Sequence, residues 1–146
     1  VTLTEIEGDG LPLSGDSLYN MDYISHSDTP LSRESWYFQQ YASFPQHGEG
    51  IPDDLPRLEI TVQRYLLPGF AAGVTKEYTH NFYYGLGDSY QSLSPAGEFD
   101  EIWHSRGERG MVLLLRRDNT VMRAEYVGEQ NLLDHLDGFG RMFESL

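Results

Sequence analysis

The chain has 146 residues, which is the length of one domain with a sizeable hydrophobic core. Its 23 acidic residues outnumber 10 lysines and arginines, and the formal net charge of −13 disfavours nucleic acid and anionic lipid as partners. The chain has no cysteine, which excludes disulfides, a thiolate nucleophile and cysteine-based zinc sites. We therefore expect a single domain over residues 1–146 whose partner, a protein or a small molecule, is neutral or cationic.

No apolar run approaches the roughly 20 residues that cross a bilayer, so no membrane span is predicted in this fragment. The chain begins at Val1 rather than Met, which favours a trimmed ectodomain or a mature chain that has lost a leader or anchor.

The N-terminal part of the chain contains candidate strands and one ambiguous segment. Val1–Glu7 and Leu18–Ile24 show partial alternation and predict short strands. Residues 30–44 fit two periods: Ser32 would cap a helix, whereas the alternation around Trp36 fits a strand. The aromatic content favours the strand, and the helix stays open as the alternative.

The middle of the chain alternates loops with regular elements. Pro45–Pro56 is rich in proline and predicts a loop, and the alternation in Arg57–Leu66 predicts a strand in the centre of a sheet. Pro68 is suited to the first turn of a helix that ends near Gly85. A strand over residues 68–85 stays open as the alternative. In the helix, three residues would share a face: Phe70, Val74 and Tyr78.

After a strand at Phe99–Ser105, the residues from Met111 predict a hairpin. Asp118 and Asn119 suit a two-residue turn because both tolerate the left-handed region. That turn sets the register and places mostly apolar pairs on one face, which we expect to be buried. The opposite face mixes Arg116, Arg123 and Glu125 with aliphatic residues, so it should be solvated or only partly covered. The pairs are Arg117–Thr120, Leu115–Met122, Leu113–Ala124 and Met111–Tyr126.

After Gly128 the apolar period changes to that of a helix, with Asn131 as a candidate N-cap and Gly138 and Gly140 as weakening residues. The predicted fold class is α+β: an antiparallel sheet of about four to six strands with one or two helices packed on one face. On this basis Leu113→Asp should unfold the domain and Val112→Asp should cost much less. The helical stripe contains Leu132, Leu136, Phe139, Phe143 and Leu146.

Short motifs provide little support for catalysis or for a metal site. Gly15–Leu18 spells the four letters of a serine hydrolase motif with Ser17 as nucleophile, but the preceding strand and a late Asp-x-x-His are missing. Two Glu-x-x-His pairs resemble di-iron ligands, although their segments do not predict a helix bundle. His47 and Glu49 offer a weak cation site in a loop, and a solvated acidic loop is the favoured alternative. We predict no catalytic residue, metal or cofactor.

A binding cleft is predicted from the aromatic segment and the following loop. Tyr37 and Tyr41 would border the cleft, and an acidic rim would select neutral or cationic partners. The alternative is that these tyrosines belong to the core. The rim residues are Glu49, Asp53 and Asp54.

The hairpin and helix of residues 111–146 resemble the closing unit of small extracytoplasmic bacterial domains that follow a lipid or membrane anchor and have unknown function. The resemblance implies an extracytoplasmic or membrane-anchored location. We expect a non-enzymatic binding or sensing module. The alternative is an acidic inhibitor, of the immunity type, that masks a basic partner, and a small hydrolase using Ser17 ranks third.

Overall fold

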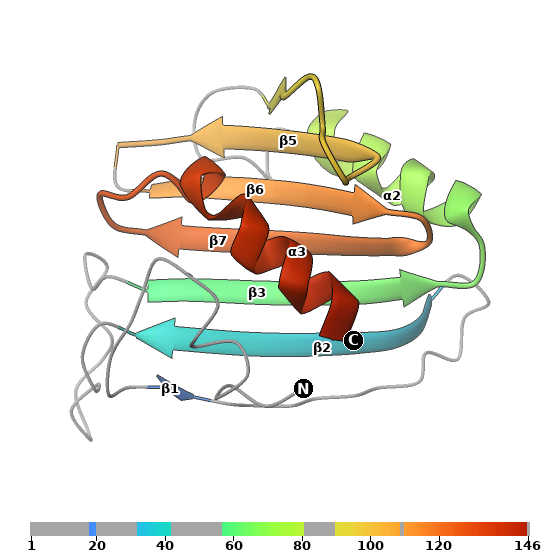
Figure 1. Cartoon of the computed structure of the whole chain (residues 1–146), viewed down its shortest axis with the longest axis horizontal. Coiled ribbons are helices and arrows are strands. Elements are labelled where there is room, and N and C mark those ends of the chain that lie inside the picture. The colour runs from blue at the N-terminus through green and yellow to red at the C-terminus, as the bar shows by residue number, and fades with distance from the viewer. Residues whose placement is uncertain (1–17, 20–31, 42–56, 81–89, 109, 146) are drawn as a thin grey trace.

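The structure is a computed structural model that describes residues 18–19, 32–41, 57–80, 90–108 and 110–145. These residues form one antiparallel sheet with a helix on each face, which confirms the α+β prediction (Figure 1). The candidate strand Val1–Glu7, most of Leu18–Ile24 and the whole of Pro45–Pro56 are outside the described residues.

Within the described residues the sheet has seven strands in the order β1-β2-β3-β7-β6-β5-β4, and each neighbouring pair is antiparallel. The outermost strands β1 and β4 have two residues each, so five longer strands carry the sheet. The strands are β1 Leu18–Tyr19, β2 Ser32–Tyr41, β3 Arg57–Tyr65, β4 Gln91–Ser92, β5 Glu101–Arg106, β6 Gly110–Arg117 and β7 Thr120–Val127.

The aromatic segment forms a strand, β2, and not the alternative helix. Ser32–Tyr41 is extended and pairs with β3, which lies between β2 and β7 as a central strand should. Trp36 is opposite Val62 and buried, and the Arg64 guanidinium lies 5.1 Å from the centre of its ring. The strand is therefore favoured because the pleated surface gives the indole both an apolar neighbour and a cation above its face.

The hairpin between β6 and β7 has its two-residue turn at Asp118 and Asn119 and the predicted register, but only Asp118, and not Asn119, is in the left-handed region. Asp118 has a φ of 54°, in the left-handed region that the turn requires. Asn119 also fixes the turn to β3, because its Nδ2 donates to the Tyr65 carbonyl at 2.8 Å and its own carbonyl accepts from the Tyr65 N–H at 2.8 Å. The pairs are Arg117–Thr120, Leu115–Met122, Leu113–Ala124 and Met111–Tyr126.

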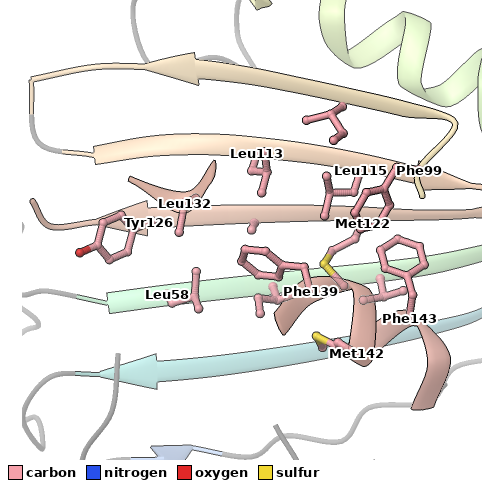
Figure 2. Packing of buried hydrophobic residues seen from close by; sticks show 14 of the residues in the cluster. Leu58, Phe99, Leu113, Leu115, Met122, Tyr126, Leu132, Phe139, Met142 and Phe143 are labelled. Atoms are coloured by element: carbon pink, nitrogen blue, oxygen red, sulfur yellow. The ribbon is translucent and has the colours of Figure 1, made fainter. Parts of the chain in front are cut away.

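The C-terminal helix covers the face that the hairpin pattern predicts as buried. It begins with a 3₁₀ turn, η2 (Leu132–His135), and continues as α3 (Leu136–Ser145). Asn131 is the N-cap, and its Oδ1 accepts from the Leu133 N–H at 3.1 Å. Figure 2 shows the helix side chains above the sheet. Those of the stripe that are buried are Leu132, Phe139 and Phe143, with Met142 beside them and Leu136 half-buried.

A second helix, α2 (Pro68–His80), lies on the opposite face of the sheet (Figure 1). The predicted helix therefore forms, and its described part ends at His80. Its buried Thr75 hydroxyl donates to the Ala71 carbonyl at 3.1 Å, so the hydroxyl is satisfied away from water. The helix contributes Ala71 to an apolar cluster whose other buried members are Tyr65, Tyr90, Val112, Leu114 and Val121.

The two helices therefore bury both faces of β6. Val112 and Leu114 on one face are as inaccessible to solvent as Leu113 on the other. The expectation that Val112→Asp is mild is wrong, because the aspartate would be placed under α2 without a partner. The mixed composition of this face is explained by Arg116 and Arg123, which are only half-buried at the edge of the α2 contact.

Candidate functional site

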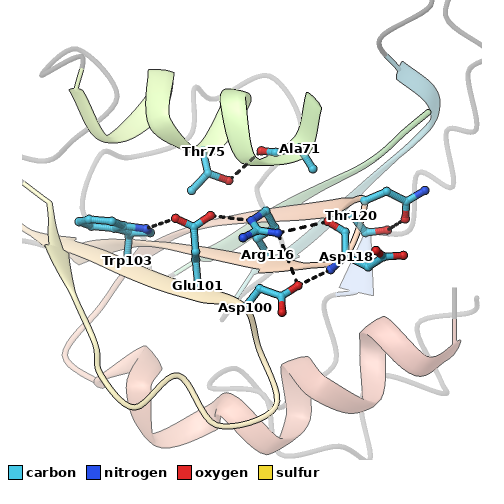
Figure 3. Close-up of polar contacts among 9 residues, drawn as sticks. Ala71, Thr75, Asp100, Glu101, Trp103, Arg116, Asp118 and Thr120 are labelled. Carbon is cyan, nitrogen blue, oxygen red and sulfur yellow. Dashed lines mark hydrogen bonds and ion pairs between the residues drawn. The ribbon is translucent and has the colours of Figure 1, made fainter. Parts of the chain in front are cut away.

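Arginines in the described residues are engaged in intramolecular contacts. Arg116 donates to Glu101 at 2.6 Å and to Asp100 at 3.5 Å, within a polar chain that includes Trp103 (Figure 3). Arg117 Nη2 lies 3.0 Å from Glu98 Oε2. Two further pairs are Arg64 with Glu34 and Arg123 with Glu125.

Three of these arginines, Arg64, Arg117 and Arg123, also lie against aromatic rings. The Arg117 guanidinium is 5.0 Å from the centre of the Phe99 ring and 5.3 Å from that of Phe143. Arg123 is 5.7 Å from the ring centre of Tyr78. Because carboxylates and π-faces already hold these cations, they add little positive charge to the outer surface.

Acidic side chains dominate the exposed positions of the described residues. Nine carboxylates are exposed there, against Lys76, Arg106 and Arg141 as exposed cations. In this part of the chain, exposed carboxylates therefore outnumber exposed lysines and arginines by three to one. The exposed carboxylates belong to Glu77, Glu98, Asp100, Glu108, Asp118, Glu129, Asp134, Asp137 and Glu144.

A groove of about 220 Å³ lies between the connection from β4 to β5 and the first turn of α3. Its deepest members, Phe99 and Ile102, are buried, and Ala96 and Leu136 are half-buried. Glu98 and Asp137 bring exposed carboxylates to its rim. We name this site the α3 groove, lined by Pro95, Ala96, Gly97, Glu98, Phe99, Ile102, Leu136 and Asp137.

A tight turn shapes one wall of the α3 groove. The Phe99 N–H donates to the Ala96 carbonyl at 3.1 Å, and Gly97 between them has a φ of 61°. That φ favours glycine because a Cβ is strained in the left-handed region. The turn presents Glu98 toward α3, where a Cβ on Gly140 would overlap its carboxylate. Gly140 thus weakens the helix and makes room for Glu98.

A second hollow, of about 250 Å³, lies at the other end of the hairpin. Its shape depends on Tyr126, whose ring and carbonyl occupy the positions that Cβ atoms on Gly128 and Gly110 would need. The Tyr126 hydroxyl accepts from the Gln130 N–H at 3.2 Å. Here the glycines serve the packing of a tyrosine, so they give no sign of a ligand.

Burial shifts the pKa values of Tyr65, Tyr90 and His104 in the direction that favours their neutral forms. Burial, with smaller contributions from Tyr78 and Glu77, raises the pKa of Tyr65 to about 12. Burial also raises the pKa of Tyr90, against the opposing effect of Arg123. The pKa of His104 is lowered by burial and by Arg106. At neutral pH both tyrosine hydroxyls keep their protons: that of Tyr65 donates to Gln63, and that of Tyr90 accepts from Arg123.

The predicted cleft cannot be assembled from the described residues. Tyr37 and Tyr41 lie on β2 opposite Thr61 and Arg57. The rim residues and the hydrolase candidate Ser17 are outside the described residues, as are His47 and Ser14–Asp16. The rim residues are Glu49, Asp53 and Asp54.

The two Glu-x-x-His pairs do not form a metal site in the described part of the chain. Glu77 and His80 are exposed on α2, and Glu101 is paired with Arg116. His104 follows Glu101 by three residues on a strand, which puts the two side chains on opposite faces. Among the described residues, no three His, Cys, Asp or Glu side chains gather as metal ligands would.

The α3 groove was missed by sequence reasoning. A Ser-Pro-Ala-Gly-Glu stretch signals a turn, but nothing local indicates that this turn meets the start of α3.

The helices in the described residues are all too short or too polar to cross a membrane. No family model, curated protein or solved structure matches this chain.

Proposed function

We propose that this chain is a non-enzymatic binding module that takes a neutral or cationic partner. The proposal is carried by the distribution of charge in the described residues: four half-buried arginines are held in ion pairs, while nine exposed carboxylates outnumber three exposed cations. A surface of one sign concentrates partners of the opposite sign and speeds their encounter. The buried Tyr65 and Tyr90 fit a binding role, because they contribute packing and hydrogen bonds within the fold.

A location outside the cytoplasm is part of the proposal. It is supported by the resemblance of the hairpin and helix to extracytoplasmic anchored domains. The full-length gene tests it: a signal sequence or anchor before Val1 supports the location, and an initiating Met directly before Val1 without a leader contradicts it.

An inhibitor that masks a basic protein is the second candidate, and the exposed carboxylates favour it. Such an inhibitor would bind one basic enzyme in a fixed ratio and block its activity, with an association rate that falls steeply with salt. A general binding module would not inhibit its partner. Enzyme assays with a basic nuclease encoded beside the gene would separate the two functions.

Binding of charged peptides tests the proposed function directly. Fluorescence anisotropy would compare labelled hexalysine with labelled hexaglutamate at about 0.01 M and about 0.15 M salt, where the Debye length falls from about 30 to about 8 Å. We expect hexalysine to bind, more weakly at the higher salt, and hexaglutamate not to bind. Equal affinity for both peptides, or no binding of hexalysine at low salt, would contradict the proposal.

A further inference from the structure

We propose that the α3 groove receives a lysine or arginine side chain of a basic partner protein. This inference rests on the proposed function and assigns it to one site. The groove lies on the face of the sheet that α3 covers, far from α2.

The size of the groove fits one side chain. Its volume of about 220 Å³ is below the roughly 300–1,000 Å³ of pockets that enclose small molecules. A cofactor or a drug-sized ligand would therefore stay largely outside it. A single long side chain inserted from a partner surface matches the available space better.

The lining of the groove fits a side chain that is apolar along its length and positive at its end. Phe99, Ile102 and Leu136 offer apolar contact to methylene groups, as the stems of lysine and arginine prefer. Glu98 and Asp137 at the rim meet the charged end. An aliphatic side chain would gain nothing from the carboxylates, and an acidic one would be repelled by them.

The two carboxylates have different roles. Glu98 pairs with Arg117 through Oε2, while its Oε1 lies over Gly140. Its position is therefore set by contacts within the fold, and part of its charge is neutralised. Asp137 is exposed in the first turn of α3, and its side chain forms no ion pair with a basic residue in the described structure. Selection for positive charge should depend mainly on Asp137.

The electrostatic test compares two variants with the same net charge. Asp137→Lys reverses the charge at the groove, and Glu77→Lys reverses an exposed charge on α2, on the other face of the sheet. We expect Asp137→Lys to weaken hexalysine binding about tenfold or more, and Glu77→Lys to weaken it by less than about threefold. Equal losses would overturn the groove as the site and leave the proposed function standing.

The steric test leaves the charge unchanged. Ala96→Leu should fill the groove and weaken hexalysine binding about tenfold, while Ala72→Leu on α2 should not change it. Circular dichroism and the melting temperature would confirm that each variant is folded. Full affinity in folded Ala96→Leu would overturn the inference alone, whereas wild-type protein that does not bind hexalysine at low salt would overturn both the inference and the proposed function.

Discussion

Glu98 lies over Gly140 so closely that a Cβ at that position would have to displace the Glu98 carboxylate. The contact joins the turn before β5 to α3. The same carboxylate also pairs with Arg117 on β6. Gly140 thus lowers the helix propensity of α3 but allows the Glu98 carboxylate to pack against the helix.

The first prediction is that Gly140→Ala stabilises less than Gly73→Ala. Gly73 on α2 has open space at its Cβ, so alanine there should add about 1 kcal/mol to the free energy of unfolding. At Gly140 the same gain should be offset by displacing Glu98 from Arg117, an exposed pair worth about 0.2–1 kcal/mol. Urea denaturation measures both. In a Glu98→Ala background Gly140→Ala should recover the full gain, and no recovery would contradict the contact.

The second prediction concerns the two buried faces of β6. Leu113→Ala and Leu114→Ala should each lower the free energy of unfolding by about 2–5 kcal/mol, because both side chains are fully buried under different helices. Leu67→Ala is the control: this side chain is 53% exposed, and its loss should change stability by less than about 0.5 kcal/mol. A small effect for Leu114→Ala alone would mean that α2 does not cover the sheet in solution.

The sequence predicted the hairpin because two independent signals agree there. Asp118 and Asn119 tolerate the turn, and the alternation around Leu113 places charges on the other face if the register slips. The position of α2 could not be predicted in this way. Arg116 and Arg123 made the second face look solvated, since long side chains reach the edge of a helix contact while their stems remain packed.

The α3 groove could not be predicted from the sequence, because its two walls are distant in the chain. The turn at Gly97 has a local signal, and so does the start of the helix near Asn131. Their juxtaposition follows from the packing of α3 across the sheet, which depends on many apolar contacts and not on a motif. The cleft predicted at Tyr37 and Tyr41 stays a prediction.

The third prediction tests the anchor of the hairpin turn. Asn119→Ala should lower the free energy of unfolding by about 1–3 kcal/mol, because the Tyr65 carbonyl loses its Nδ2 donor. Asp118→Gly should be neutral or stabilise by up to about 1 kcal/mol, since glycine accepts the φ of 54° without strain. Denaturation of both variants by urea provides the comparison. If the two substitutions have equal effects, the side-chain hydrogen bond does not anchor the turn.

The fourth prediction is a loss of stability at alkaline pH. The raised pKa of Tyr65, about 12 in the fold against 10.0 in the unfolded chain, means that the native state keeps a proton that the unfolded chain loses. The free energy of unfolding should be unaffected by this group below about pH 10. Between about pH 10 and pH 12 it should fall by up to about 1.4 kcal/mol per pH unit. Urea midpoints measured across this range follow the change.

Tyr65→Phe is the matched variant for the alkaline transition. It removes the titrating hydroxyl, together with its hydrogen bond to Gln63 at 2.5 Å, so it should be less stable at neutral pH. Its stability should then fall less steeply above pH 10, with Tyr90 contributing what remains. Parallel pH profiles for the variant and the wild type would show that Tyr65 does not titrate as the structure indicates.

The most direct measurement of the binding site is an NMR titration of ¹⁵N-labelled protein with hexalysine. We expect the largest shifts at the backbone amides of Gly97, Glu98 and Asp137, and we expect these shifts to saturate together. Amides on α2 should change little, although Glu77 is also exposed and acidic. Shifts of similar size at Glu77 and Asp137, or shifts spread evenly over the exposed carboxylates, would contradict a binding site at the α3 groove.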